Sequence, residues 1–112
     1  MAHELARSAH FRVTHVYESA SVHSSEGWQL GVGEFYGDPQ VALIDADERW
    51  CAVAGEGLVI CELMPQGRCT AYFRAPGRML WITELRQVAD WVLAVRGEDG
   101  CWHRVDLRVA CP

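Results

Sequence analysis

Residues 41–63 constrain the fold more than any other part of the chain. They form three short apolar runs, at 41–45, 50–54 and 58–63, separated by an acidic turn and by a Gly-Glu-Gly turn. Short apolar runs between turn residues are typical of strands, and glycine supplies the positive φ that a tight hairpin needs. The first run is apolar at successive positions, which indicates a strand covered on both faces. The segment therefore predicts a three-stranded antiparallel meander at the centre of the fold.

The rest of the chain adds extended segments of the same kind. Residues 10–18 alternate between apolar and polar positions, and residues 28–36 carry Gly31 and Gly33, which indicate a bulge. Residues 75–77, Ala-Pro-Gly, predict a type II turn. The other expected strands are 68–74, 79–86, 91–96 and 101–109. Residues 1–9 are expected to be a loose arm or a short turn, and the serine-rich residues 19–27 a loop.

These segments predict a mainly β fold in a single domain spanning residues 1–112. We expect antiparallel meander sheets, or a small β-sandwich or partial barrel, with about seven to eight short strands.

Residues 80–96 leave two interpretations open. Their apolar residues also recur at helical spacing, with Thr83 to cap a helix and Gly97 to end it. Their β-branched and aromatic residues favour strands. Trp50 and Trp91, 41 residues apart, each open an apolar run followed by a glycine-flanked acidic turn and a second apolar run. The spacing is near that of a propeller blade, but two units cannot close a propeller, so we expect two meanders of one sheet or of two packed sheets.

Composition limits the compartment and the partners. The net charge is −5, and all ten basic residues are arginine. This balance disfavours a nucleic-acid partner, which requires a basic face. No apolar run is long enough for a signal peptide or a membrane span. Together with an odd number of cysteines, five, these features predict a cytoplasmic protein with free thiols.

No motif predicts catalysis, a cofactor or a metal. Cys101 and His103 would share a strand face, but structural zinc usually takes two close ligand pairs and the chain has no C-x-x-C. No signature flanks a cysteine as it would a nucleophile. The two Gly-x-Gly sequences, at 31–33 and 55–57, lack the third glycine and the helix of a nucleotide-binding loop. We therefore expect no catalytic, cofactor-binding or metal-binding residues.

The candidate partner-binding residues are acidic turn residues and one tryptophan. The carboxylates are expected to be solvated at loop tips, either as ordinary turn residues or as a negative rim that speeds association with a basic partner. Trp102 would share a face with Arg104, and an exposed tryptophan beside arginine is typical of interface hot spots. Alternatively, Trp102 stacks on Arg104 or covers a sheet edge. The candidates are Asp45, Asp47, Glu48, Glu56 and Trp102.

Residues 34–63 combine several of these features: Gly37-Asp38-Pro39, the apolar run 41–45, Trp50 and Gly55-Glu56-Gly57-Leu58. This combination, with a looser match over 79–108, resembles small β-rich bacterial immunity proteins. These proteins accompany polymorphic toxins delivered by contact-dependent or type VI secretion, including Rhs-type toxins. The resemblance implies a cytoplasmic, non-enzymatic protein that binds one cognate toxin domain and occludes its active site. Many such toxins act on nucleic acid through a basic cleft, which an acidic rim would suit.

Two other functions stay open. A small β-barrel enzyme or small-ligand-binding protein would carry a deep pocket lined by His or Cys with a perturbed pKa. A structural adaptor would form a homodimer through an exposed edge strand.

Overall fold

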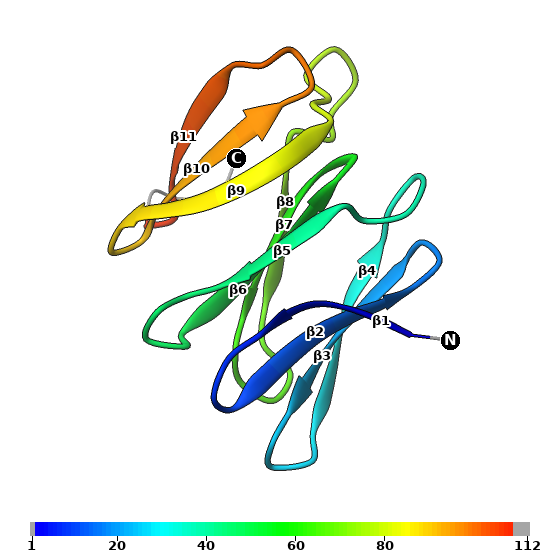
Figure 1. Ribbon diagram of the computed structural model, residues 1–112, viewed down its shortest axis with the longest axis vertical. Coiled ribbons are helices and arrows are strands. Elements are labelled where there is room, and N and C mark those ends of the chain that lie inside the picture. Colours follow the sequence, from blue (N-terminus) through cyan, green and yellow to red (C-terminus); the bar gives the residue numbers. More distant parts are fainter. Residues whose placement is uncertain (1, 109–112) are drawn as a thin grey trace.

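The chain folds into a stack of three antiparallel β-sheets (Figure 1). The computed structural model describes residues 2–108, and within them it contains eleven strands and no helix. The predicted mainly β, antiparallel class is confirmed. The predicted count of about seven to eight strands is wrong, and two of the eleven strands, His3–Arg7 and Ser19–Ser24, lie in segments expected outside the sheets. The described strands form separate sheets, so the partial barrel is wrong as well.

The first sheet contains, in spatial order, β1 (His3–Arg7), β2 (Phe11–Val16), β3 (Ser19–Ser24) and β4 (Gln29–Glu34). The loose arm predicted over residues 1–9 is wrong, because His3–Arg7 pairs with β2. The loop predicted over 19–27 is wrong for Ser19–Ser24. There Ala20 and Val22 alternate with serines and place their side chains in the core, at 3% and 0% exposure.

The bulge predicted at Gly31 and Gly33 is confirmed. Ala20 of β3 lies opposite Gly33 and the next residue, Ser21, lies opposite Gly31, so Val32 is the extra residue in β4. Gly33 has a φ of +126°, which strongly favours glycine. The bulge leaves the Val32 side chain buried in the core.

The central sheet contains β5 (Val41–Ile44), β6 (Trp50–Gly55), β7 (Gly57–Glu62) and β8 (Cys69–Tyr72). The predicted meander at the centre of the fold is confirmed. Every residue of β6 is buried, because its side chains alternate between two cores. Cys51 and Val53 pack towards the first sheet, whereas Trp50, Ala52 and Ala54 pack towards the third.

The third sheet contains β9 (Ile82–Ala89), β10 (Val92–Gly97) and β11 (Trp102–Asp106). The alternative of a helix over residues 80–96 is wrong. In β10, Leu93 and Val95 are fully buried while Arg96 is exposed, so the burial has period two. β9 and β10 are joined by a tight turn in which Trp91 has a φ of +59°.

The three sheets stack with their first strands aligned, since β5 packs against both β1 and β9. Trp50 opens the second strand of the central sheet, and Trp91 precedes the second strand of the third. The internal similarity therefore marks equivalent positions in two packed sheets. The type II turn is confirmed as well, because the Arg78 amide donates to the Ala75 carbonyl and Gly77 has a φ of +79°.

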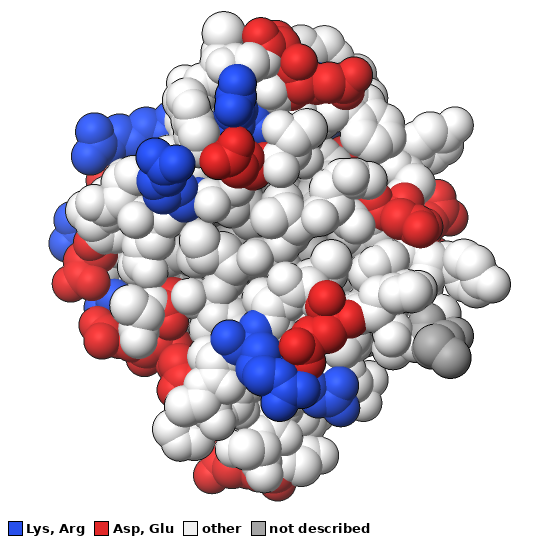
Figure 2. All heavy atoms as spheres, in the orientation of Figure 1, with Lys and Arg blue, Asp and Glu red and all other residues white. Residues whose placement is uncertain are grey.

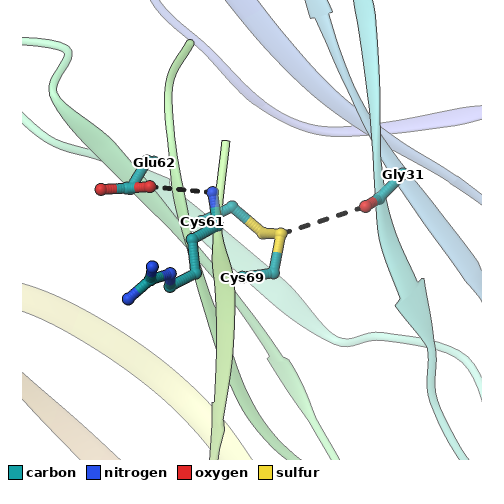
Figure 3. The surroundings of a disulfide bond; sticks show 5 residues. Gly31, Cys61, Glu62 and Cys69 are labelled. Carbon is teal, nitrogen blue, oxygen red and sulfur yellow. Dashed lines mark hydrogen bonds between the residues drawn. A yellow bond between two sulfur atoms is a disulfide. The ribbon is translucent and has the colours of Figure 1, made fainter. Parts of the chain in front are cut away.

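A disulfide joins Cys61 of β7 to Cys69 of β8 (Figure 3). The prediction of free thiols is wrong for this pair, because the register places the two residues directly opposite each other, with their Cα atoms 4.1 Å apart. Cys51 is free and buried and Cys101 is free and exposed, while Cys111 lies outside the described residues. The compartment stays a prediction. Over residues 2–108 there is no helix with the length and apolar character to cross a bilayer.

Candidate functional site

The loop between β5 and β6 contains three of the candidate residues. Asp45 was expected at a solvated loop tip, but its exposure is only 1%. Its Oδ2 accepts hydrogen bonds from the backbone amide (3.0 Å) and Nε (2.8 Å) of Arg49, and its Oδ1 accepts from Nε2 of Gln87 (2.8 Å). Burial alone would raise the pKa of Asp45, but these hydrogen bonds outweigh it and lower the pKa to about 2. Asp45 therefore holds the loop to β9.

Arg49 extends this arrangement to the turn between β9 and β10. Its Nη2 lies 2.8 Å from Oδ1 of Asp90 and 3.5 Å from Oδ2 of Asp47, and its guanidinium lies 4.6 Å from the ring centroid of Trp91. The hydrogen bonds that Arg49 donates to Asp45 and Asp90 raise the pKa of Arg49. We call Asp45, Arg49, Gln87 and Asp90 the Asp45 cluster. The side chain of Asp47 is 68% exposed, so this candidate still faces solvent.

Glu48 joins the same loop to the first sheet. Its carboxylate accepts hydrogen bonds from the Ser8 hydroxyl and from the His10 amide (2.9 Å), and lies 2.7 Å from Nδ1 of His10. The hydrogen bonds from Ser8 and His10 lower the pKa of Glu48 to about 2. Ser8, His10 and Glu48 form the Glu48 cluster. The carboxylate of Glu48, like that of Asp45, is therefore engaged in hydrogen bonds within the molecule.

Glu56 and Trp102 lie apart from this loop. Glu56 connects the far end of β6 to β7, where it is half-buried and forms an isolated β-bridge with Trp81. Trp102 begins β11 in the third sheet. The structure thus brings Asp45, Asp47 and Glu48 together but not the other two candidates.

The outer side of the third sheet presents Trp102 to solvent. This side chain is 42% exposed, lies opposite Arg96 in the register, and has the guanidinium of Arg86 5.1 Å from its ring centroid. Arg104 lies on the same side, and Glu84 pairs with both Arg96 (3.4 Å) and Arg86 (3.8 Å). Basic side chains surround an acidic one over the third sheet in Figure 2. We call this surface the Trp102 face; it comprises Glu84, Arg86, Ala94, Arg96, Trp102, Arg104 and Asp106.

An open groove lies on the inner side of the same sheet, between β8 and β11. Its volume is about 850 Å³, and its apolar lining includes Tyr72, Phe73, Met79 and Leu80. Met79 is 47% exposed. His103 of β11 also lines it, with its ring centroid 6.0 Å from that of Phe73. Sequence reasoning missed this groove, because it depends on how two sheets meet.

The described residues contain no group of three or more His, Cys, Asp or Glu side chains placed to hold a metal ion. Sequence reasoning missed Arg49, Gln87 and Asp90. The spacing of Asp45 and Arg49 was visible, but Gln87 and Asp90 lie more than 40 residues away from Asp45 and Arg49 respectively. Comparison with protein-family models, curated proteins and solved structures finds no match to this chain.

Proposed function

We propose that this protein is an immunity or inhibitor protein that binds a cognate secreted bacterial toxin domain and occludes its active site. The observation that carries the proposal is the Trp102 face. A large aromatic side chain stands 42% exposed among three arginines on the solvent side of a sheet. Tryptophan and arginine are the residues most enriched at the energetic centres of protein interfaces. The role is binding, with no catalytic residue assigned.

The resemblance of residues 34–63 to bacterial immunity proteins supports the same function. A toxin with a basic cleft would be met by the exposed carboxylates of Asp47 and Asp90, whose side chains are 68% and 72% exposed. Asp45 and Glu48 contribute indirectly, because they hold this loop in place. Glu56 stays a candidate contact at the opposite end of β6.

Small-ligand binding is the alternative, and one observation favours it. The groove volume of about 850 Å³ lies within the range of ~300–1,000 Å³ found for small-molecule sites. The experiment below separates the two functions, because a ligand binder gives no protection against a toxin.

The test is co-expression of this chain with the product of the adjacent upstream gene, which the proposal expects to be the toxin. We expect restored growth and a complex that co-purifies, burying at least ~1,200 Å². Trp102→Ala should weaken the complex about 30-fold or more, which corresponds to ~2 kcal/mol at a hot spot. The control is Tyr36→Ala, since Tyr36 is 73% exposed on the loop between β4 and β5. Absence of both growth rescue and co-purification would refute the proposal.

A further inference from the structure

The third sheet has one strand fewer than the other two. Within residues 2–108, the first and central sheets each contain four strands, and the third contains β9, β10 and β11. One side of β11 pairs with β10, and no described strand pairs with the other. An edge of this kind offers a row of backbone donors and acceptors to another chain.

The stacking shows where a fourth strand of the third sheet would lie. Across the first interface, the fourth strands of the two sheets face each other, since Sγ of Cys69 in β8 lies 4.0 Å from the carbonyl oxygen of Gly31 in β4 (Figure 3). The opposite side of β8 faces the third sheet. There, no described strand takes the place that β4 takes in the first interface.

Among the described residues, two grooves border that place. The groove of about 850 Å³ runs from Tyr72 to His103, at one end of β11. A second groove of about 190 Å³ lies at the other end, lined by Tyr72 and Leu107 among others. Val105 lies between His103 and Leu107 and on the same side of β11. One groove therefore lies at each end of the inner side of β11.

The backbone of β11 has the correct orientation to accept a strand. The Gly97 amide donates to the Cys101 carbonyl (3.0 Å), and the Leu107 amide donates to the Trp91 carbonyl (2.7 Å). Because hydrogen-bonding direction alternates along an antiparallel strand, residues 101, 103, 105 and 107 face β10. The amides and carbonyls of Trp102, Arg104 and Asp106 consequently point to the unpaired edge.

We propose that an extended segment of the partner protein pairs with β11 and completes the third sheet as its fourth strand. This inference rests on the proposed function for the source of the strand. Successive side chains of such a strand point alternately into the groove and onto the Trp102 face. The groove side is lined by Phe73, Met79 and Leu80 and takes apolar side chains.

The other side of the strand would lie beside Trp102, Arg104 and Asp106. On that side Arg86, Arg96 and Arg104 outnumber the carboxylates of Glu84 and Asp106, so acidic side chains fit. The recognised segment therefore alternates apolar and acidic residues. Main-chain pairing supplies affinity and the alternating side chains supply specificity, as in other cases of strand addition.

The probe is a seven-residue peptide that alternates glutamate and valine and is blocked at both ends. At ~3.4 Å per residue it spans the five residues of β11. One control peptide has the same composition with its valines contiguous, and another replaces glutamate with lysine. We expect saturable binding of the alternating acidic peptide, with both controls at least about tenfold weaker. Equal affinity for all three peptides, or no saturation by about 1 mM, would overturn the proposal.

Amide hydrogen exchange of the full chain, measured by NMR, locates the binding. The amides of Trp102, Arg104 and Asp106 should exchange at least about tenfold more slowly with peptide bound. The amide of Gln29, on the free edge of β4, should not change. Unchanged exchange at all three β11 positions, or slow exchange there already in the free protein, would overturn the proposal. The second result would mean that this chain fills its own edge.

A proline variant tests the edge itself. Arg104→Pro removes an edge-facing donor at a position where edge strands tolerate proline, and should weaken peptide binding at least about tenfold. Gln29→Pro is the matched variant on the edge of β4 and should bind as the unsubstituted protein does. If Arg104→Pro fails to fold, the exchange experiment decides. Peptide pairing without protection from the toxin would refute the proposed function alone, whereas protection without strand pairing would refute this inference alone.

Discussion

The two sides of the central sheet are packed in different ways. On the side of the first sheet, four strands face four, and the outermost strand β8 is met by β4. On the side of the third sheet, three strands of the described part of the chain face four, and β8 borders an open groove. Both sides have a continuous apolar core, so the two sides differ in how much of the central sheet the neighbouring sheet covers. A sheet can therefore carry an apolar core on both sides although the described strands cover one side less completely than the other.

The polar connections across the two interfaces also differ. The Asp45 cluster connects the central sheet to the third through a carboxylate that is 1% exposed. The Glu48 cluster connects it to the first sheet through His10, whose side chain is 66% exposed. Buried charge interactions cost much more to break than exposed ones, because a remaining partner loses its compensation away from water. The less completely covered interface is thus the one with the stronger polar connection.

Removing the carboxylate of the Asp45 cluster should have the largest effect. Asp45→Ala should lower the free energy of unfolding by about 3 kcal/mol, at the lower end of the ~3–5 kcal/mol expected for a broken buried pair. The value is at the lower end because Arg49 retains its ion pair with Asp90 and its side chain is 32% exposed. Urea unfolding measures the change. The control is Asp47→Ala in the same loop, which should stay within about 0.5 kcal/mol of the unsubstituted protein.

The dependence of stability on acid pH tests the same prediction in a second way. The pKa of Asp45 falls from 3.8 to about 2 on folding, so its stabilisation is complete above pH 3.8 and is lost as the pH falls through 2. Asp45→Asn should remove this part of the acid dependence. Equal stability of Asp45→Ala and Asp47→Ala would show that the two interfaces do not differ as described.

Reducing the disulfide should have an intermediate effect, on the side of the first sheet. Cys61 and Cys69 are eight positions apart in the sequence, and a loop of this length contributes about 2.5 kcal/mol in the chain-entropy model. Reductant should lower the urea midpoint of the unsubstituted protein, and the corresponding loss of unfolding free energy should match this contribution. The double variant Cys61→Ala, Cys69→Ala should not respond to reductant, whereas the Cys101→Ala control should respond in full. An unchanged midpoint after complete reduction would contradict the prediction.

Local patterns predicted much of this fold. Glycine placed the bulge in β4 and the hairpin between β6 and β7, and the Pro-Gly pair placed a type II turn. Cys61 and Cys69 flank the turn expected at residues 64–67, which places them on neighbouring strands. A register symmetrical about that turn would pair Cys61 with Thr70, so the disulfide depends on a one-residue shift that the local pattern does not contain.

Other features depend on contacts that no local pattern contains. Ser19–Ser24 is a strand because Ala20 and Val22 meet a core built by another sheet, although its serines are typical of a loop. Asp45 has the sequence context of a solvated turn and is buried because Gln87, from β9, covers it. The groove beside β11 follows from the number of strands in each sheet. Trp102 was recognisable as a candidate because its own strand alternates, but Arg86, which lies over its ring, comes from β9.

The Glu48 cluster should give the smallest effect, with a distinctive dependence on pH. The pKa of Glu48 falls from 4.5 to about 2 on folding, so its contribution is complete above pH 4.5 and is lost towards pH 2. The pKa of His10 rises above 6.5, mainly through its hydrogen bond to Glu48, so its contribution is complete below pH 6.5 and is lost at higher pH. The two contributions coincide between pH 4.5 and 6.5.

Glu48→Gln should therefore destabilise the protein most between pH 4.5 and 6.5 and less on either side. Urea unfolding of both proteins from pH 3 to 8 measures the difference. Because His10 is largely exposed, high salt should reduce the loss of unfolding free energy caused by Glu48→Gln. The loss caused by Asp45→Ala should change little with salt. A difference that is constant with pH and salt would mean that Glu48 acts through packing rather than charge, and the contrast between the two interfaces would then rest on the number of strands alone.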